Sequence, residues 1–336
     1  MSWYTIPGVD QDVVLHTRVH VFRNLHGLPF PAHMKADEAA ALIENVGNIL
    51  SGNGFHKIDF TDISHTAAYA YAEQQYISPR FVRQSLLHAL YLNEPCNLSV
   101  SLCDDDHIRI CGLMPGCALR DAFNSAYKIE GLLDTHFDFA FDDRLGYLTQ
   151  HPSDVGLGMG MSVMLALPAL CLSGLMPSLI KHLHPIGLSV HPLCQEADHA
   201  LGFLYHVSLS SGSGVDEQTV CSHMGKAIQQ IIDAERTKRK SLPPELTEQL
   251  MDEAARSKGI LNSARSLSVK EFIQRSSYMR LGIALGWIDD IHIETLNSLL
   301  IEAMPATLTM SSETPPQGQS EQDKLRATVV RERLSV

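Results

Sequence analysis

A stretch between residues 97 and 110 places three carboxylates where a strand would otherwise continue. Residues 98–102 alternate apolar and small polar side chains, the period of two that is typical of a strand. Three aspartates follow at positions 104–106, and the alternation then resumes with Arg109 between two isoleucines. Charged groups beside a sheet cost desolvation free energy unless they are solvated, paired or used. The pattern therefore predicts either a hairpin tip with solvated acids or a functional site.

The chain as a whole excludes several classes of protein. Its 336 residues allow one large domain or two smaller ones with a sizeable core. The net charge of -12 argues against a nucleic-acid or anionic-membrane surface. The longest apolar run, residues 163–172, is too short to cross a bilayer, and no signal peptide is recognisable. Seven cysteines without a CxxC pair favour reduced thiols. We therefore expect a cytoplasmic protein with neither a nucleic acid nor a membrane as partner.

The hydrophobic patterns predict strands and helices without a regular βαβ alternation, which is typical of an α+β fold. Helices are predicted over residues 37–50, 67–75, 81–92, 119–133, 161–172 and 220–240, and throughout the region after 245. Strands are predicted over residues 98–102, 108–110, 186–190 and 203–209, and a glycine-rich loop over 146–160. Residues 310–322 are rich in Ser, Pro, Gln and Glu and predict a flexible linker before a last helix at 323–334.

Two further patterns are less specific. Gly156, Gly158 and Gly160 lack the third glycine of the dinucleotide-binding GxGxxG fingerprint, and no βαβ unit surrounds them. A histidine-rich stretch could hold zinc, but its spacing matches no known ligand pattern, so we expect no metal site. Its members are His182, His184, His191, Cys194, Asp198 and His199.

Several stretches, in the same order along the chain, resemble the ATP:guanido phosphotransferases, and most closely the bacterial protein-arginine kinases of the McsB type. They are residues 106–110 (DHIRI), 138–149 (DFAFDDRLGYLT), Glu196 with 200–202 (ALG), 233–236 (DAER) and 280–286 (RLGIALG). The resemblance implies a catalytic domain over 1–242, with an antiparallel sheet flanked by helices, and a helical C-terminal domain over 245–336. It also implies transfer of the γ-phosphoryl group of ATP to a guanidinium, with arginines holding the phosphates.

At the positions implied for ATP, the arginine set is incomplete. Arg18 and Arg109 stand where the family has phosphate-binding arginines, whereas the other three such positions hold His20, Gly160 and His191. Near pH 7 an unperturbed histidine is mostly neutral, and glycine has no side chain to contribute. A nucleotide-contacting histidine of the protein-kinase branch corresponds to Gln75.

The positions implied for the guanidinium substrate are changed less. Asp104 and Asp105 stand in place of paired glutamates, and Glu196 keeps the second substrate carboxylate. His151 replaces a reactive cysteine that helps to orient the guanidinium.

The last helix carries a further family feature. Protein-arginine kinases have an RDxxRA motif that binds phosphoarginine, and this chain reads QDKLRA, with Gln322, Asp323 and Arg326 at the motif positions. Only the first arginine of the motif is changed.

Two hypotheses follow for activity. Loss of one preorganised charge donor raises a barrier by roughly 3–4 kcal/mol, so three missing arginines predict a large loss of rate even if their effects are not additive. The first hypothesis is a pseudokinase that acts in protein quality control; the alternative is an active, divergent protein-arginine kinase using Mg-ATP. The resemblance implies as partners arginine or phosphoarginine proteins, a Clp-type unfoldase, a zinc-binding activator protein and a second copy of the chain.

Overall fold

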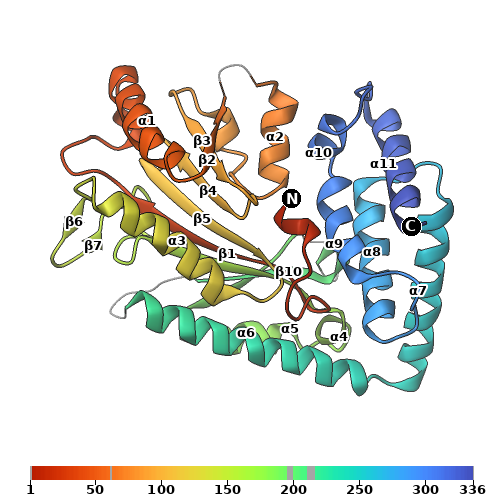
Figure 1. The fold of residues 1–336 in the computed structure, drawn as a ribbon. Coiled ribbons are helices and arrows are strands. Elements are labelled where there is room, and N and C mark those ends of the chain that lie inside the picture. Colours follow the sequence, from red (N-terminus) through yellow and green to blue (C-terminus); the bar gives the residue numbers. More distant parts are fainter. Residues whose placement is uncertain (1, 61–62, 195–199, 210–215, 336) are drawn as a thin grey trace.

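The computed structural model describes residues 2–60, 63–194, 200–209 and 216–335. An antiparallel sheet of eight strands, in the order β2-β3-β4-β5-β1-β8-β10-β9, forms its centre (Figure 1). The strands are β1 Val14–Arg23, β2 Phe55–Asp59, β3 Ala89–Asn93, β4 Leu98–Leu102, β5 Ile108–Pro115, β8 Met159–Ala166, β9 Leu188–Pro192 and β10 Leu204–Leu209. A separate small hairpin joins β6 Phe141–Asp142 to β7 Gly146–Tyr147.

One face of the sheet is buried under three long helices. These are α1 Ala36–Ser51, α3 Leu119–Asp134 and α6 Glu217–Lys240. Val19 and Val21 of β1 point into this core, together with Val163 of β8 and Val46 of α1. Successive strand residues point to opposite faces, so Arg18, His20 and Phe22 of β1 point to the other face.

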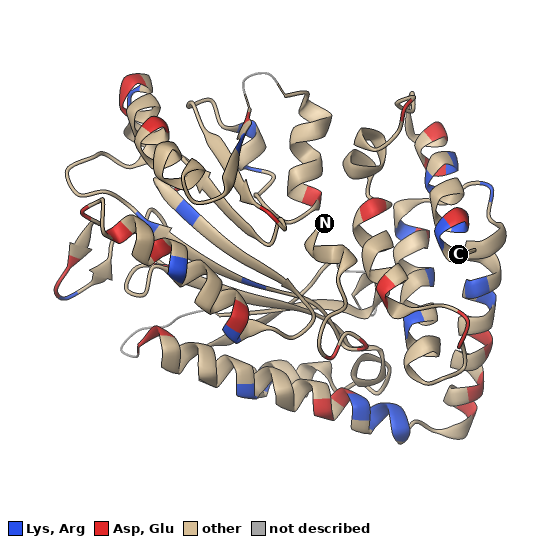
Figure 2. Ribbon diagram, in the orientation of Figure 1, with Lys and Arg blue, Asp and Glu red and all other residues tan. Residues whose placement is uncertain are grey.

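That other face meets the C-terminal helices at one end. The helices are α7 Pro244–Ser263, α8 Val269–Ala284, α9 Ile293–Glu302, α10 Pro305–Met310 and α11 Gln319–Leu334. Leu15, Met164 and Leu204 of the sheet share one hydrophobic core with these helices. The charged side chains lie mainly on the helices and few lie on the strands (Figure 2). An α+β architecture, with an antiparallel sheet flanked by helices and a helical C-terminal region, is thus confirmed.

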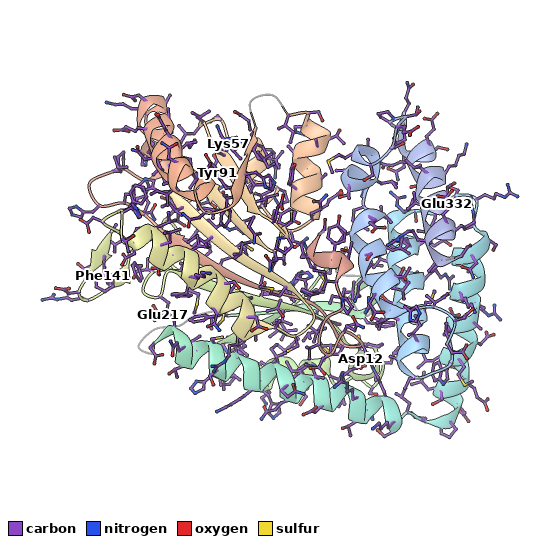
Figure 3. The ribbon with its side chains drawn as sticks, viewed as in Figure 1. Asp12, Lys57, Tyr91, Phe141, Glu217 and Glu332 are labelled. Carbon is purple, nitrogen blue, oxygen red and sulfur yellow. The ribbon has the colours of Figure 1, made fainter. Side chains whose placement is uncertain are left out.

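The N-terminal segment contacts both the sheet region and the C-terminal helices. Asp12 lies beside the end of α6 (Figure 3), where it accepts hydrogen bonds from Arg236 and Arg239. The buried Arg280 of α8 donates to the carbonyl of Gln11 at 2.9 Å. Because residues 11–12 bind both regions, the predicted boundary between a domain over 1–242 and a domain over 245–336 stays a prediction.

Three sequence predictions of local structure were wrong. Residues 161–172 form β8 and the short helix α4 Pro168–Leu172, since a central strand buried on both faces lacks alternation. Residues 81–92 hold a short 3-10 helix and then β3 instead of an α-helix. The last helix begins at Gln319, so part of the predicted 310–322 linker is helical.

Candidate functional site

The implied nucleotide positions lie on one face of the sheet because of strand register. His20 of β1 stands opposite Gly160 of β8 and Cys111 of β5, and Arg109 stands opposite Phe22. His191 lies on β9, two strands from β8. It stands opposite His206 of β10, which in turn stands opposite Met164 of β8. Directly opposed residues point to the same side of a sheet, so Arg18, His20, Gly160, Arg109 and His191 share the face opposite the α3 and α6 core.

Arg18 is held by neutral partners. Its Nη1 donates to Gln75 Oε1 at 2.8 Å, and its Nε donates to Ser162 Oγ at 3.3 Å. Gln75 has a left-handed backbone with φ of 70°, directly after helix α2 His65–Glu73. Burial lowers the pKa of Arg18, although an arginine stays protonated at ordinary pH. In the described residues Arg18 has no carboxylate partner, so its charge is available to an anion.

Arg109 is already paired with an acid. Its Nη1 donates to Asp104 Oδ2 at 3.0 Å, while its Nε faces His20 Nδ1 at 3.4 Å. Burial, with Arg109 and Arg18 nearby, lowers the pKa of His20 well below its ordinary value. His20 is therefore a neutral acceptor for Arg109 near pH 7, and it supplies no positive charge to a phosphate.

The other two implied phosphate positions also lack a cation. Gly160 has no side chain, and an added Cβ would meet Phe22 Cε2 at 3.5 Å, an ordinary contact. His191 is exposed on β9. The face therefore presents two arginines where the family implies five.

The three aspartates form the tip of the β4–β5 hairpin, but they are not simply solvated. Asp104 and Asp106 are each only 2% exposed. Asp106 Oδ1 accepts hydrogen bonds from Asn24 Nδ2 at 2.6 Å and from the Gln150 amide at 2.8 Å. Burial raises the pKa of Asp106. Asp106 therefore fixes the tip against its surroundings.

An open cavity of about 200 Å³ lies beside this tip. Asp105 forms an ion pair with Arg80, in which Arg80 Nη1 lies 3.2 Å from Asp105 Oδ1. His151 Nε2 lies 3.1 Å from Oδ2 of the same carboxylate. Asp104 Oδ1 is buried and has no hydrogen-bond partner in the described parts of the chain. An unpaired buried carboxylate oxygen favours a cationic donor. The lining residues are Phe22, Asp104, Asp105, Asp106, Arg109, His151 and Asp154.

Sequence reasoning missed several members of this site. Arg80 lies outside the stretches that carry the chemistry, and Asn24, which ends the first arginine stretch, was assigned no role; each reaches the acids only through the tertiary fold. Asp154 lines the cavity, and burial raises its pKa. Glu196, the second implied substrate carboxylate, lies outside the described residues.

The residues of the C-terminal motif, Gln322, Asp323 and Arg326, take part in the packing of the C-terminal helices. Arg326 is fully buried and donates to the carbonyls of Ala303 at 2.8 Å and Leu267 at 2.7 Å. It also pairs with Asp323 Oδ1 at 2.6 Å, and Gln322 Nε2 donates to Pro305 O at 3.3 Å. Arg326 Nη2 is buried and has no partner within the described ranges. A ligand could gain one new contact at this nitrogen, so phosphoarginine binding stays a prediction.

Within the described residues, no three His, Cys, Asp or Glu side chains are grouped so as to hold a metal ion, and no helix is long and apolar enough to cross a membrane. Two members of the considered zinc cluster, Asp198 and His199, lie outside these residues.

The eight-stranded antiparallel sheet with its flanking helices has the phosphagen-kinase-like fold. The structure of lombricine kinase superposes with a TM-score of 0.60 at 16% identity, covering 70% of each chain. A substrate-free duplicated taurocyamine kinase from Schistosoma mansoni superposes with a TM-score of 0.60 at 18% identity, covering 81% of this chain and 42% of that one.

Sequence comparison narrows the class. Residues 40–238 match the ATP:guanido phosphotransferase C-terminal catalytic domain, and residues 247–336 match the protein-arginine kinase McsB C-terminal domain. A protein-arginine kinase of Clostridium acetobutylicum is 32% identical over 99% of both chains. One of Geobacillus thermodenitrificans is 33% identical over 100% of this chain and 94% of the relative. The chain belongs to the protein-arginine kinase family of ATP:guanido phosphotransferases.

Proposed function

We propose that this chain is a protein-arginine kinase homologue with lost or strongly reduced phosphoryl transfer, which acts by binding arginine or phosphoarginine proteins. The observation that carries the proposal is the pairing of Arg109 with Asp104 at 3.0 Å. It leaves Arg18, in the described residues, as the one implied phosphate arginine without a carboxylate partner. Transfer of a phosphoryl group needs several preorganised charges at once.

Mg-ATP fits these residues poorly. Arg18 and Arg109 would contact the phosphates, and Ser162 and Gln75 would add neutral groups beside Arg18. His20 is neutral near pH 7 because burial lowers its pKa. We therefore expect weak nucleotide binding or none.

The acidic cavity supports binding of a guanidinium. Asp104 Oδ1 is buried without a partner among the described residues, and a guanidinium N–H would satisfy it. Asp105 and His151 lie on the same cavity wall, already in contact at 3.1 Å. An arginine side chain of a client protein could enter here without being phosphorylated.

The proposed setting follows the family resemblance. It is cytoplasmic protein quality control, with a Clp-type unfoldase, a zinc-binding activator protein and a second copy of this chain as partners. Co-purification from cells with a tagged chain would test each partner separately.

One observation favours the second candidate, an active but divergent kinase. The carboxylate side of the site is assembled although its residues are changed, because Asp104, Asp105 and His151 line one open cavity next to Arg109. A kinase that draws its missing phosphate contacts from outside this face would still need these groups.

A turnover assay separates the two candidates. The protein is incubated with Mg-ATP and an arginine-rich protein, and phosphoarginine is measured by 31P NMR, with the Geobacillus stearothermophilus protein-arginine kinase as positive control. We expect little or no phosphoarginine from this chain. Formation at roughly 1–100 per second, as in ordinary kinases, would establish the active candidate instead.

A further inference from the structure

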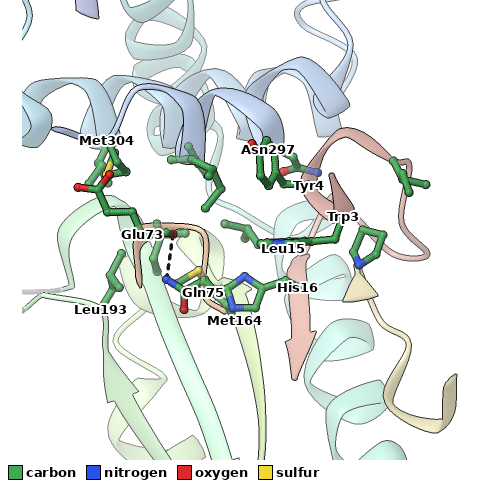
Figure 4. A pocket seen from close by; sticks show the side chains of 16 residues that line it. Trp3, Tyr4, Leu15, His16, Glu73, Gln75, Met164, Leu193, Asn297 and Met304 are labelled. Atoms are coloured by element: carbon green, nitrogen blue, oxygen red, sulfur yellow. Dashed lines mark hydrogen bonds between the residues drawn. The ribbon is translucent and has the colours of Figure 1, made fainter. Parts of the chain in front are cut away.

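The segment that follows helix α2 contributes side chains near two cavities. Glu73 and Gln75 line a cavity of about 180 Å³ between the sheet and the C-terminal helices (Figure 4), which includes one of the implied nucleotide positions. Further along the chain, Arg80 pairs with Asp105 in the wall of the acidic cavity. Among the described residues none lines both cavities, so Arg80 belongs with the acidic cavity alone.

Arg80 brings a guanidinium group to a carboxylate that the family resemblance assigns to a guanidinium substrate. Its Nη1 lies 3.2 Å from Asp105 Oδ1. The other oxygen of Asp105 contacts His151 Nε2 at 3.1 Å. Both oxygens of Asp105 are thus engaged within the chain, so the arginine of a client protein can reach this carboxylate only by displacing a neighbour.

The other carboxylate implied for the guanidinium keeps one oxygen open. Asp104 Oδ2 accepts from Arg109 Nη1 at 3.0 Å, whereas Asp104 Oδ1 has no hydrogen-bond partner in the described parts of the chain. A guanidinium has several N–H groups in one plane and binds most strongly when carboxylate oxygens meet more than one of them. Binding to both acids of the cavity therefore needs the oxygen that Arg80 holds.

The backbone that carries Arg80 is fixed, although the side chain itself is 67% exposed. Pro79 precedes it, and the fully buried Phe81 follows it, with a ring centroid 4.6 Å from that of His88. The carbonyl of Arg80 accepts from the amide of Arg83 at 3.0 Å. Only the side chain of Arg80 must therefore move to release Asp105.

The balance between Arg80 and a ligand follows from the position of the pair. An exposed pair between an arginine and a carboxylate gains little free energy in water, so a ligand can displace Arg80. Because Arg80 is part of the same chain, it stays near Asp105 at a high effective concentration. A competitor of this kind weakens the apparent affinity of a ligand in proportion to the fraction of molecules in which it occupies the site.

We propose that Arg80 is an autoinhibitory competitor, which occupies the guanidinium side of the acidic cavity until a client arginine displaces it. The inference rests on the function proposed above, since it requires that the cavity binds an arginine side chain. The client guanidinium would replace Arg80 at Asp105 Oδ1 and donate a second N–H to Asp104 Oδ1, while Arg80 moves into water. One ion pair is exchanged for another, and no covalent bond changes.

The test titrates the full chain with a blocked peptide that has one arginine between glycines. Arg80→Gln keeps a polar side chain but removes the competing charge, so calorimetry should show binding about two- to sixfold tighter than in the parent, the gain expected when an exposed pair no longer competes. Arg83→Gln removes the same charge from an exposed neighbour whose Nε donates to the carbonyl of Pro79, and it should leave the affinity unchanged. Equal tightening in both variants would attribute the gain to charge alone and overturn the proposal.

A remote variant completes the control for charge. Lys181→Gln lies at an exposed position of helix α5 (Met176–Leu183), outside both cavities, and should also leave the affinity unchanged. Tightening as large as that of Arg80→Gln would again overturn the proposal, because the net charge of the chain would then explain it.

The outcomes separate this proposal from the function on which it rests. If the parent binds the peptide and Arg80→Gln binds it no more tightly, the cavity takes an arginine but Arg80 does not compete, and only this proposal is overturned. Asp104→Asn should weaken binding in the parent and in Arg80→Gln alike. If it leaves both affinities unaltered, or if neither protein binds the peptide at millimolar concentration, the acidic cavity does not hold a guanidinium, and the proposed function fails as well.

Discussion

Arg109 and Asp104 bind each other across the turn of the β4–β5 hairpin, with Nη1 and Oδ2 3.0 Å apart. The family resemblance assigns these positions to different ligands, the arginine to phosphate and the acid to guanidinium. Their direct pairing cancels one positive charge on a face that has few. His20, also in contact with Arg109, is kept neutral by burial, which lowers its pKa. The phosphate-binding face is therefore weakened both by missing arginines and by the pairing of one that remains.

Restoring charge on this face should restore nucleotide affinity. Gly160→Arg with His191→Arg adds two guanidinium groups to the face that carries Arg18. Gly160 has room for a side chain, because an added Cβ would make its nearest contact at 3.5 Å. We expect ADP to bind at least about tenfold tighter, since each charge-assisted hydrogen bond contributes roughly 1.5–3 kcal/mol. Calorimetric titration measures the change.

A control for net charge accompanies this variant. Gly131→Arg with His182→Arg adds the same residues at exposed positions on α3 and α5, away from the face. If the control tightens ADP binding as much, general electrostatic attraction explains the gain. If the first variant binds no better than the parent, the nucleotide site has been placed wrongly. Neither variant should catalyse transfer, because Asp104, Asp105 and His151 still differ from the family pattern.

Buried histidines should make the fold sensitive to mild acid. Burial lowers the pKa of His206 to about 4 from an ordinary value of 6.5, and it also lowers those of His16 and His20. The unfolded chain therefore binds more protons than the native one below about pH 6.5, and stability falls as pH falls from there. For His206 alone the loss at pH 5 is on the order of 2 kcal/mol. Urea unfolding at pH 7.5 and pH 5 measures it.

A substitution assigns the effect to one residue. His206→Gln keeps a polar side chain that does not titrate, so the difference in unfolding free energy between pH 7.5 and pH 5 should shrink. His182→Gln, at an exposed position on α5, should leave that difference unchanged. An unaltered difference in His206→Gln would mean that carboxylates, and not this histidine, control acid sensitivity.

The sequence predicted the α+β class, and strand register brings the strand residues that its family resemblance named onto one face of the sheet. It misassigned residues 161–172, since a strand buried on both faces has the same continuous apolar pattern as a buried helix. It could not predict that Arg109 forms an ion pair with Asp104, nor that Arg80 forms one with Asp105. Such pairings depend on side-chain conformation and on loops whose paths no local pattern encodes.

The hydrogen bonds of Glu73 should contribute to stability by joining α2 to the C-terminal helix α10. Its carboxylate accepts from two backbone amides at the start of α10 and from Thr307 Oγ1 at 2.9 Å. Glu73→Ala leaves these donors without their partner and should destabilise the protein by roughly 1.5–3 kcal/mol. Glu44→Ala, at an exposed position on α1, should change stability by less than about 0.5 kcal/mol. Equal denaturation midpoints for the two variants would show that the α10 contact adds little.

Arg326 has a structural role that any binding test must take into account. Its guanidinium is fully buried, pairs with Asp323 and donates to two carbonyls from other segments. Arg326→Ala should therefore cost roughly 3–5 kcal/mol of stability, as expected when one partner of a buried pair is removed. Arg333→Ala, on the exposed side of the same helix, should cost less than about 1 kcal/mol. A loss of phosphoarginine binding in Arg326→Ala would not by itself locate the ligand.

Gln322→Arg is the sharper test of the C-terminal site, because it restores the first arginine of the family motif without touching Arg326. Gln322 is half-buried, and its side chain donates two long hydrogen bonds, both 3.3 Å, to Pro305 O and Thr309 Oγ1. A guanidinium at this position should tighten binding of free phosphoarginine by roughly 1.5–3 kcal/mol, or at least about tenfold, if it contacts the phosphoryl group. Ser320→Arg adds the same charge two residues earlier, at an exposed position of the same helix, and should have little effect. Calorimetric titration of the parent and both variants decides the matter: equal affinities for the two variants, or no heat from any of them at millimolar ligand, would remove phosphoarginine from the role of this helix.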